Sequence, residues 1–442
     1  MGIEEYLKGR KLLKEEIPQM YHDALESSNI KKQKGMIVSG NQVICQRCLS
    51  KSTTSQSCIS QKKHSFYYCD QCILLGRIES RKTLYSMKEK KRKPRAVVFS
   101  WEGTLTKSQK QLSCCLLKAY KKHQHFLVHA VTGAGKTEML FPLIHYALKQ
   151  GSRVAVVSPR VDVCLELFPR FQEAFNQEEM VLLYGKQNEP YCYTSFVVAT
   201  THQLLRFEEA FDLIVVDEVD AFPYAGNQML ENGVKKALKK RSVLVYLTAT
   251  PSQNLLQQVE KKELMTESLS KRYHQHSLPV PVCYFDFFLK KKLSKGKLPK
   301  VLESLLREQK RQCLIFLPNI ERMKRCFKLM SQQFPEKKIA YVHASKEDRE
   351  ELILSMRKGE IDWLLCTTIL ERGVTFPNID VIVLEAEHPV FNTASLVQIA
   401  GRVGRKADYP TGQVSFIHQG KTRHMNQAIK QINEMNQKAG FK

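Results

Sequence analysis

The sequence predicts an α/β protein with two parallel-sheet domains and a small N-terminal module that carries four paired cysteines. Three observations predict this fold. Short apolar runs alternate with segments of helical periodicity, this alternation occurs twice along the chain, and the first 95 residues lack it. The 442 residues are 43% hydrophobic, which is enough for several domain cores and excludes intrinsic disorder for most of the chain.

The chain is strongly basic, with 69 Lys and Arg residues, 44 Asp and Glu residues and a net charge of +25. Residues 31–95 hold 16 of these cations against Asp70, Glu79 and Glu89. Such an excess indicates a polyanionic partner, either nucleic acid or an acidic membrane surface. No uncharged apolar run approaches the roughly 18 residues of a membrane span, and the N-terminus lacks a signal-peptide pattern. We therefore expect a cytoplasmic protein with reduced cysteines.

We expect an N-terminal basic zinc-binding module at residues 1–95 and a first α/β domain at 96–285. A basic linker at 286–300 contains six lysines from Lys290 onward, and a second α/β domain with a helical tail follows at 301–442. Both domains alternate strand-like runs with helix-length segments, which is typical of parallel sheets covered by helices. The predicted strands are 125–131, 153–159, 195–201, 211–218, 241–250, 312–318, 338–344, 363–368, 381–387 and 413–419.

Four cysteines in the N-terminal module form two C-x₂-C pairs separated by twenty residues: Cys45, Cys48, Cys69 and Cys72. Two such pairs complete the tetrahedral S₄ coordination that Zn²⁺ prefers, and four thiolates leave no open position for a reacting water. The spacing therefore predicts a structural zinc site, without Cys58 or His64 as ligands. The aromatic run 66–68 and the surrounding lysines suit contact with nucleic acid, although docking onto a protein partner is almost as well supported.

The segment HAVTGAGKTEM (129–139) has the composition of a phosphate-binding loop. Glycines allow backbone amides to approach phosphate oxygens, and the N-terminus of the following helix adds partial positive charge. We expect Lys136 to reach the β- and γ-phosphates and Thr137 to ligate Mg²⁺. Ala130 stands where the consensus has its first glycine. The predicted nucleotide-binding residues of the loop are Thr132, Gly133, Ala134, Gly135, Lys136 and Thr137.

Two further motifs complete a predicted site for ATP hydrolysis. The run FDLIVVDEVD (211–220) places Asp217 and Glu218 after an apolar strand, where Asp217 would hold Mg²⁺ through water and Glu218 would polarise the attacking water. The run QIAGRVGR (398–405) supplies Arg402 and Arg405, which we expect on one helix face directed at the γ-phosphate. Gln398 shares that predicted face.

The order of the runs LTKSQ, AVTGAGKT, SPRVD, TTHQLL, DEVD, TAT, LIFLP, TTILERGVT and QIAGRVGR resembles the motif ladder of superfamily 2 helicases and translocases over residues 100–410. Together with the four-cysteine module, the details of these runs resemble the ComFA family of late-competence ATPases from Gram-positive bacteria. DEVD rather than DEAD, and Gln398 rather than His, separate the chain from the RNA-unwinding DEAD-box branch.

The resemblance implies two RecA-like lobes and assigns further roles. It implies adenine recognition by Gln109, a nucleotide contact at Gly373, and a link between hydrolysis and lobe movement at Thr248 and Thr250. The DNA-binding residues that it implies are Arg160, Thr201, His202, Thr368 and Arg372.

The function that we expect is an ATP-dependent single-stranded DNA translocase that drives uptake of transforming DNA, with ATP, Mg²⁺ and structural Zn²⁺ as cofactors. The family implies the membrane channel ComEC and the small protein ComFC as partners, and a peripheral position at the inner face of the membrane. Whether the chain forms an oligomer is left open. Two alternatives remain: a helicase of replication restart or repair similar to PriA, and a nucleotide-gated DNA clamp without sustained ATP turnover.

Overall fold

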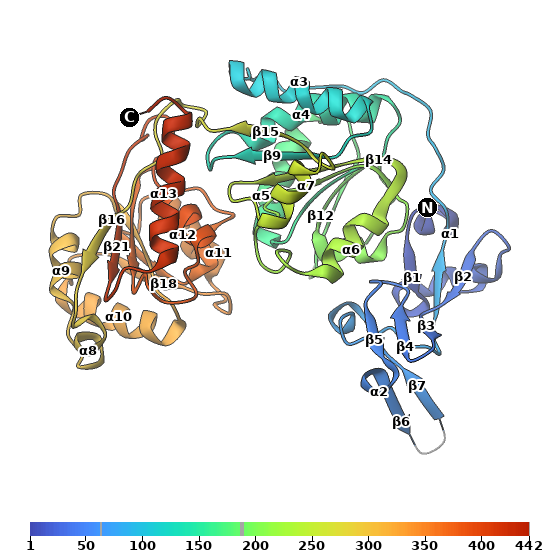
Figure 1. The fold of residues 1–442 in the computed structure, drawn as a ribbon, viewed down its shortest axis with the longest axis horizontal. Coiled ribbons are helices and arrows are strands. Elements are labelled where there is room, and N and C mark those ends of the chain that lie inside the picture. Colours follow the sequence, from blue (N-terminus) through green and yellow to red (C-terminus); the bar gives the residue numbers. More distant parts are fainter. Residues whose placement is uncertain (62–63, 186–189, 442) are drawn as a thin grey trace. The chain divides into compact units, whose positions relative to one another are not determined.

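The computed structural model describes residues 1–61, 64–185 and 190–441 (Figure 1). The chain divides into two compact units. The first unit comprises Met1–His129 and Lys136–Ser268, and the second comprises Ala130–Gly135 and Leu269–Lys442. Each unit contains one large sheet, in agreement with the two α/β domains that the sequence predicts. Within the described ranges, every helix is too short or too polar to cross a lipid bilayer.

The first unit is built on a seven-stranded sheet with the strand order β11-β12-β10-β13-β14-β9-β15. The pairs from β11 through to β9 are parallel. All five predicted strands of this domain are confirmed, while β11 and β15 were not predicted. Both are edge strands of four or five residues with polar or half-exposed positions, so their apolar signal is weak. The strands are Phe126–Ala130 (β9), Val154–Ser158 (β10), Met180–Leu183 (β11), Phe196–Thr200 (β12), Phe211–Val216 (β13), Leu238–Thr248 (β14) and Met265–Leu269 (β15).

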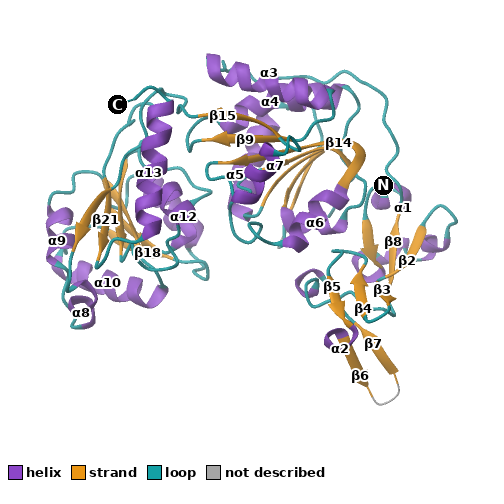
Figure 2. Ribbon diagram, in the orientation of Figure 1, coloured by secondary structure: helices purple, strands orange, loops and turns teal. Residues whose placement is uncertain are grey.

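Helices cover both faces of this sheet (Figure 2). They are Lys107–Lys121 (α3), Lys136–Lys149 (α4), Val161–Ala174 (α5), Gln228–Ala237 (α6) and Gln253–Glu260 (α7). Because the sheet is covered on both sides, its central strands are buried throughout, as all five residues of β10 show. Polar groups of the connecting loops therefore gather at the two edges where strands begin and end.

The N-terminal residues form three small sheets with the strand orders β1-β8-β2, β3-β4-β5 and β6-β7. Their strands are Lys11–Leu13, Lys31–Lys34, Met36–Ser39, Gln42–Cys45, Lys51–Thr53, Cys58–Gln61, His64–Tyr67 and Thr83–Ser86 for β1 to β8; the short helices of this region are Ile3–Leu7 (α1) and Thr54–Ser57 (α2). Their apolar residues, such as Leu12 and Leu84, belong to one hydrophobic cluster with Val157 and Val216 of the large sheet. Residues 1–95 are thus not a separate compact unit, because their core is shared with the first α/β domain.

The second unit contains a six-stranded parallel sheet with the order β16-β21-β20-β17-β19-β18. The predicted strands of this domain and its helical tail are confirmed. The strands are Val282–Phe285 (β16), Gln312–Phe316 (β17), Ile339–Val342 (β18), Trp363–Cys366 (β19), Ile379–Leu384 (β20) and Val414–His418 (β21); the helices are Leu289–Ser294 (α8), Lys300–Arg307 (α9), Ile320–Gln333 (α10), Arg349–Arg357 (α11), Thr393–Ala400 (α12) and Arg423–Lys438 (α13).

The predicted basic linker at 286–300 is part of this second domain. Residues 282–285, which our boundary assigned to the first domain and for which we predicted no strand, form β16 and pair with β21. Helix α8 buries Leu289 and Leu293 in the core of the second unit. Six lysines dominate the composition of this segment, but two leucines four positions apart give its helix one apolar face. The prediction followed the charge and missed this spacing.

Candidate nucleotide-hydrolysis site

The predicted phosphate loop has the backbone that phosphate binding requires. Strand β9 ends at Ala130 and helix α4 begins at Lys136, as expected from the sequence. Between them Gly133 and Gly135 adopt φ angles of 78° and 71°, which residues with a Cβ rarely adopt. Thr137 lies in the first turn of α4 and is buried. The loop therefore presents backbone amides and a helix N-terminus, the groups that bind a triphosphate.

The two predicted catalytic acids follow β13. The backbone N–H of Asp217 donates to the carbonyl of Val157 at 2.7 Å, and the Asp217 carboxylate accepts from the backbone N–H of Glu218 at 2.8 Å. Glu218 has a φ of 53°, an uncommon conformation for a residue with a side chain. Because β9 and β13 are strands of one sheet and run in the same direction, these acids and Lys136 lie at the same carboxyl edge.

A third carboxylate, Asp220, connects this acidic turn to the end of β14. It accepts hydrogen bonds from the hydroxyls of Thr248 and Thr250 at 2.7 and 2.6 Å. Sequence analysis named both threonines but not their partner. The only indication of this partner in the sequence was that Asp220 is the last residue of the DEVD motif. These two hydrogen bonds join the acidic turn that contains Asp217 to the TAT motif.

The arginine motif differs from the prediction in one respect. Helix α12 ends at Ala400, and residues 401–404 form a turn, so Arg402 and Arg405 do not share a helix face. Gly404 has a φ of 68°, so the backbone between the two arginines is not helical, contrary to what their spacing had indicated. Gln398 lies on α12 itself and is buried.

The two arginines therefore have different surroundings. Arg402 is buried, and its guanidinium donates to the carbonyls of Glu371, at 3.0 Å, and Val374. Arg402 thus stabilises the 371–374 segment of its own domain, and its geometry does not support the predicted direct contact with a phosphate. Arg405 is partly exposed and its Nε donates to the carbonyl of Gly401 at 3.1 Å.

Arg272, which sequence analysis missed, lies between the phosphate loop and this arginine turn in the second unit. Its guanidinium donates to the carbonyls of Val403 and Gly404 at 2.8 and 2.6 Å, and its side chain lies 3.8 Å from the position of a Cβ built on Gly133. Burial, followed by the charge of Arg405, lowers the pKa of Arg272. The run SKRYHQ that contains it has no motif that would have identified it.

A second contact in the same unit shows how close the two motifs are. A Cβ built on Gly401 would lie 2.0 Å from the Thr132 hydroxyl, so only glycine fits there. Thr132 and Gly133, which belong to the second unit, therefore pack against Gly401 and Arg272 of the same unit.

Of the residues assigned to the adenine and to DNA, several have structural roles of their own. Gln109 is buried and its side-chain oxygen accepts from the backbone N–H of Thr106, forming a capping box at the start of α3. Thr201 and Arg372 are buried, with exposed fractions of 0% and 2%, so neither side chain lies on the surface where a strand would bind. The assignment of these two residues to DNA contact is not supported by their burial.

The remaining assigned positions are accessible. Arg160 precedes α5 and is partly exposed, as is Thr368 at the start of a 3₁₀ turn. His202 is also partly exposed, and burial lowers its pKa, which favours the neutral imidazole. Gly373 has a φ of 74°, which accounts for glycine at this position.

The four predicted cysteine ligands come together as the spacing indicates. The sulfur atoms of Cys45, Cys48, Cys69 and Cys72 all lie within 4.8 Å of one another and are buried. The Sγ atoms of Cys45 and Cys72 are 3.8 Å apart, and those of Cys48 and Cys69 are 3.6 Å apart. Tetrahedral zinc with bonds of about 2.3 Å places its sulfurs about 3.8 Å apart, so this set of donors fits Zn²⁺. Cys58 is exposed and lies outside this group, and the side chain of His64 lies outside the described residues.

Comparisons with known proteins agree with this organisation. Residues 1–86 match the competence protein ComFA N-terminal domain, residues 102–253 match the type III restriction enzyme res subunit, and residues 296–407 match the helicase conserved C-terminal domain.

Two similar relatives are the competence proteins ComFA of Streptococcus pneumoniae and Bacillus subtilis. The first is 42% identical and the alignment covers 93% of each chain. The second is 36% identical, covering 99% of this chain and 96% of the relative. The transcription-repair-coupling factor of B. subtilis is 26% identical over 70% of this chain and 27% of its own length.

Among solved structures, S. cerevisiae Dbp5 bound to RNA and ADP BeF3 has a TM-score of 0.57 at 17% identity, covering 75% of this chain and 87% of Dbp5. At this identity the likeness shows the fold alone, which is that of two RecA-like domains.

Proposed function

The chain belongs to the ComFA family of competence proteins, and from this membership we propose that it is an ATP-driven translocase on single-stranded DNA that serves DNA uptake. The observation that supports the proposal is a helicase-type ATPase core in which Lys136, Asp217 and Glu218 lie at one edge of the first sheet.

In this mechanism the loop amides and Lys136 bind the β- and γ-phosphates, and Thr137 and Asp217 hold Mg²⁺. When bound, Mg²⁺ neutralises charge that develops on the phosphates. Glu218 orients and polarises the attacking water, and Arg405 stabilises the negative charge of the transferring group. We retain Arg405 and not Arg402 for this role, because Arg405 is partly exposed whereas the side chain of Arg402 is buried and donates to two carbonyls of its own domain.

Asp220 provides the route by which hydrolysis would move the DNA-binding surface. Its carboxylate joins the acidic turn to Thr248 and Thr250, so a rearrangement at Glu218 is transmitted to the end of β14. Arg160 and His202 are the accessible residues through which the first domain would contact the strand, with Thr368 in the second. The grip is proposed to be mostly to phosphates, since a motor that moves arbitrary DNA cannot depend on base identity.

The family name places the activity in competence, and we propose a position at the inner face of the membrane, next to the ComEC channel and the ComFC protein. The net charge of +25 is consistent with a DNA track near that channel. The zinc site is proposed to be structural, since its four thiolates would fill the coordination sphere.

The test is the steady-state ATPase rate of the purified protein with no nucleic acid, single-stranded DNA, duplex DNA and RNA, with Lys136→Ala as the inactive control. Single-stranded DNA should stimulate hydrolysis well above duplex and RNA. Equal rates with and without DNA would favour a nucleotide-gated clamp. Stimulation by forked duplex combined with strand separation would favour a PriA-like helicase.

A further inference from the structure

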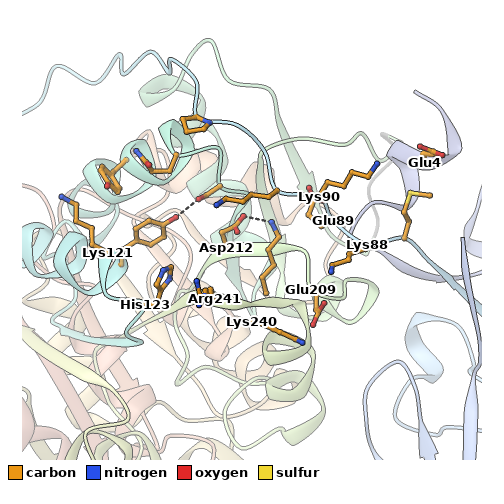
Figure 3. Close-up of a pocket in the computed structure, with 18 of the residues that line it drawn as sticks. Glu4, Lys88, Glu89, Lys90, Lys121, His123, Glu209, Asp212, Lys240 and Arg241 are labelled. Atoms are coloured by element: carbon orange, nitrogen blue, oxygen red, sulfur yellow. Dashed lines mark hydrogen bonds and ion pairs between the residues drawn. The ribbon is translucent and has the colours of Figure 1, made fainter. Parts of the chain in front are cut away.

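The first unit contains a large groove at one edge of its sheet, and none of the predicted hydrolysis residues lines it. Its volume is 1210 Å³, and it is lined by the starts of strands, the C-terminal ends of α3 and α4, the segment 87–94, and Glu4 and Asn29 of the N-terminal region (Figure 3). Ser152 precedes β10, Asp212 is the second residue of β13, and Lys240 lies near the start of β14. We call this cavity the amino-edge groove.

The position of the amino-edge groove separates it from the motor motifs. The strands β9 to β14 are parallel, so their starts meet at one edge of the sheet and their ends at the other. The phosphate loop, Asp217 and Arg160 follow strand ends, whereas the groove is formed by residues that precede or begin strands. A ligand in the groove would therefore occupy a site distinct from the proposed DNA track at the carboxyl edge.

The charge of the amino-edge groove is positive, because seven Lys and Arg residues line it against four Asp and Glu residues. Of these acids, Glu89 is paired with Arg153 and Asp212 with Lys239, at 3.0 and 2.8 Å, while Glu4 and Glu209 also face the groove. Six exposed cations line it and form no ion pair with a carboxylate in the described part of the chain: Lys88, Lys90, Lys91, Lys121, Lys240 and Arg241. Figure 3 labels Lys88 and Lys90 on the connecting segment, and Lys240 and Arg241 at the start of β14.

The shape and lining of the groove favour a single nucleic-acid strand over other anions. Small-ligand pockets measure roughly 300–1,000 Å³ and are mostly apolar, and this cavity is larger and rich in lysine. A flat bilayer surface cannot follow a concave wall. The exposed ring of His123 and the partly exposed ring of Tyr146 stand among the cations, and aromatic rings of this kind are surfaces on which bases can stack. Lys121 lies 4.9 Å from the centre of the Tyr146 ring, so charge and stacking surface occur together.

We propose that the amino-edge groove binds a second segment of single-stranded DNA through its phosphates, apart from the motor track. This inference rests on the proposed function, since it takes single-stranded DNA as the substrate. Lys90 of the connecting segment and Lys240 of β14 contact phosphates, and contact is independent of base sequence. A strand held at two separate places stays bound while the motor track releases and regrips it.

The test compares two double variants, Lys90→Ala/Lys91→Ala and Lys240→Ala/Arg241→Ala, with Lys324→Ala/Lys328→Ala. The control pair removes the same charge from the exposed face of α10. Fluorescence anisotropy gives the Kd for long and short labelled oligonucleotides between 50 and 200 mM salt. The salt slope is the magnitude of the slope of log affinity against log salt concentration. Each lost phosphate contact lowers it by about 0.7, so each groove variant, which removes two cations, should lower it by about 1.4 for the long strand. The ratio of the variant's Kd to the wild-type Kd should accordingly fall about seven-fold between the lowest and the highest salt concentration.

Three results would overturn the inference. The first is a groove variant that has the same salt slope as the control pair, although the wild type binds DNA. This result would refute the groove as a binding site and would leave the proposed translocase function standing. The second is an unchanged DNA slope with lost binding to phosphatidylglycerol vesicles or to polyglutamate, which assigns the groove to a membrane or an acidic protein. A wild type that binds no single-stranded DNA refutes the proposed function as well. ATPase stimulated by the short oligonucleotide should be unchanged in both groove variants, because the motor track is intact.

Discussion

Replacing Glu89 by Gln tests how the N-terminal residues are joined to the motor. Glu89 and Arg153 are an ion pair with side-chain exposures of 0% each. Arg153 also donates to the carbonyls of Lys8 and Thr194 and to the hydroxyl of Tyr191. Glutamine retains a hydrogen-bond acceptor but leaves the guanidinium charge buried and uncompensated. Breaking such a pair costs about 3–5 kcal/mol, and we expect the free energy of unfolding to fall by about 3 kcal/mol.

Urea unfolding followed by two probes measures this loss. Trp101 fluorescence, isolated by Trp363→Phe, reports the first unit, and zinc release reports the four-cysteine site. Both transitions should shift together, because the N-terminal residues and the sheet share one hydrophobic cluster. The control Glu15→Gln removes an exposed partner of Lys82 and should cost less than about 1 kcal/mol. A loss below about 1 kcal/mol for Glu89→Gln, or a shift of the zinc transition alone, would refute the reasoning.

Three further predictions concern hydrolysis, zinc and pH. Glu218→Gln should bind ATP and DNA with near-normal affinity yet lower kcat at least about 100-fold, measured by ATPase and filter binding; unchanged turnover excludes Glu218 as the base. Cys45→Ser should release about one zinc per chain by elemental analysis and lower the stability of the first unit, whose core is shared; a wild type without zinc removes this prediction. Lys236 donates to the carbonyls of Arg47 and Leu205, and burial lowers its pKa from 10.5 to about 7. Between these values the unfolded chain binds a proton that the folded chain does not, so stability should rise from pH 7 towards 10.5 by at most about 1.4 kcal/mol per pH unit. The rise should be smaller in Lys236→Gln, and an identical profile contradicts the assignment.

The sequence predicted the elements whose physical signal is local. Strands β9, β10, β12 and β13 are mostly apolar because both faces of the sheet are buried. The phosphate loop was predictable because its backbone conformation requires glycine at particular positions. The zinc site was predictable because two C-x₂-C pairs are a typical spacing of structural zinc ligands.

What the sequence did not predict depends on contacts between distant segments. Arg272 reaches the carbonyls at 403 and 404, more than one hundred residues away, and no local pattern indicates this. Asp220 acquires its role only where β13 and β14 end side by side. Burial of Thr201 and Arg372 also follows from tertiary packing, whereas their motifs indicated exposure to a strand. The amino-edge groove likewise joins lysines of residues 88–91 to the start of β14.

The central claim is that ATP hydrolysis moves the protein along single-stranded DNA. The most direct measurement is displacement of streptavidin from biotin at one end of a single-stranded oligonucleotide, scored for each end separately. The account predicts displacement from one end only, dependent on ATP and absent in Glu218→Gln. Hydrolysis that DNA stimulates without displacement from either end would contradict translocation and leave an ATP-gated DNA-binding protein.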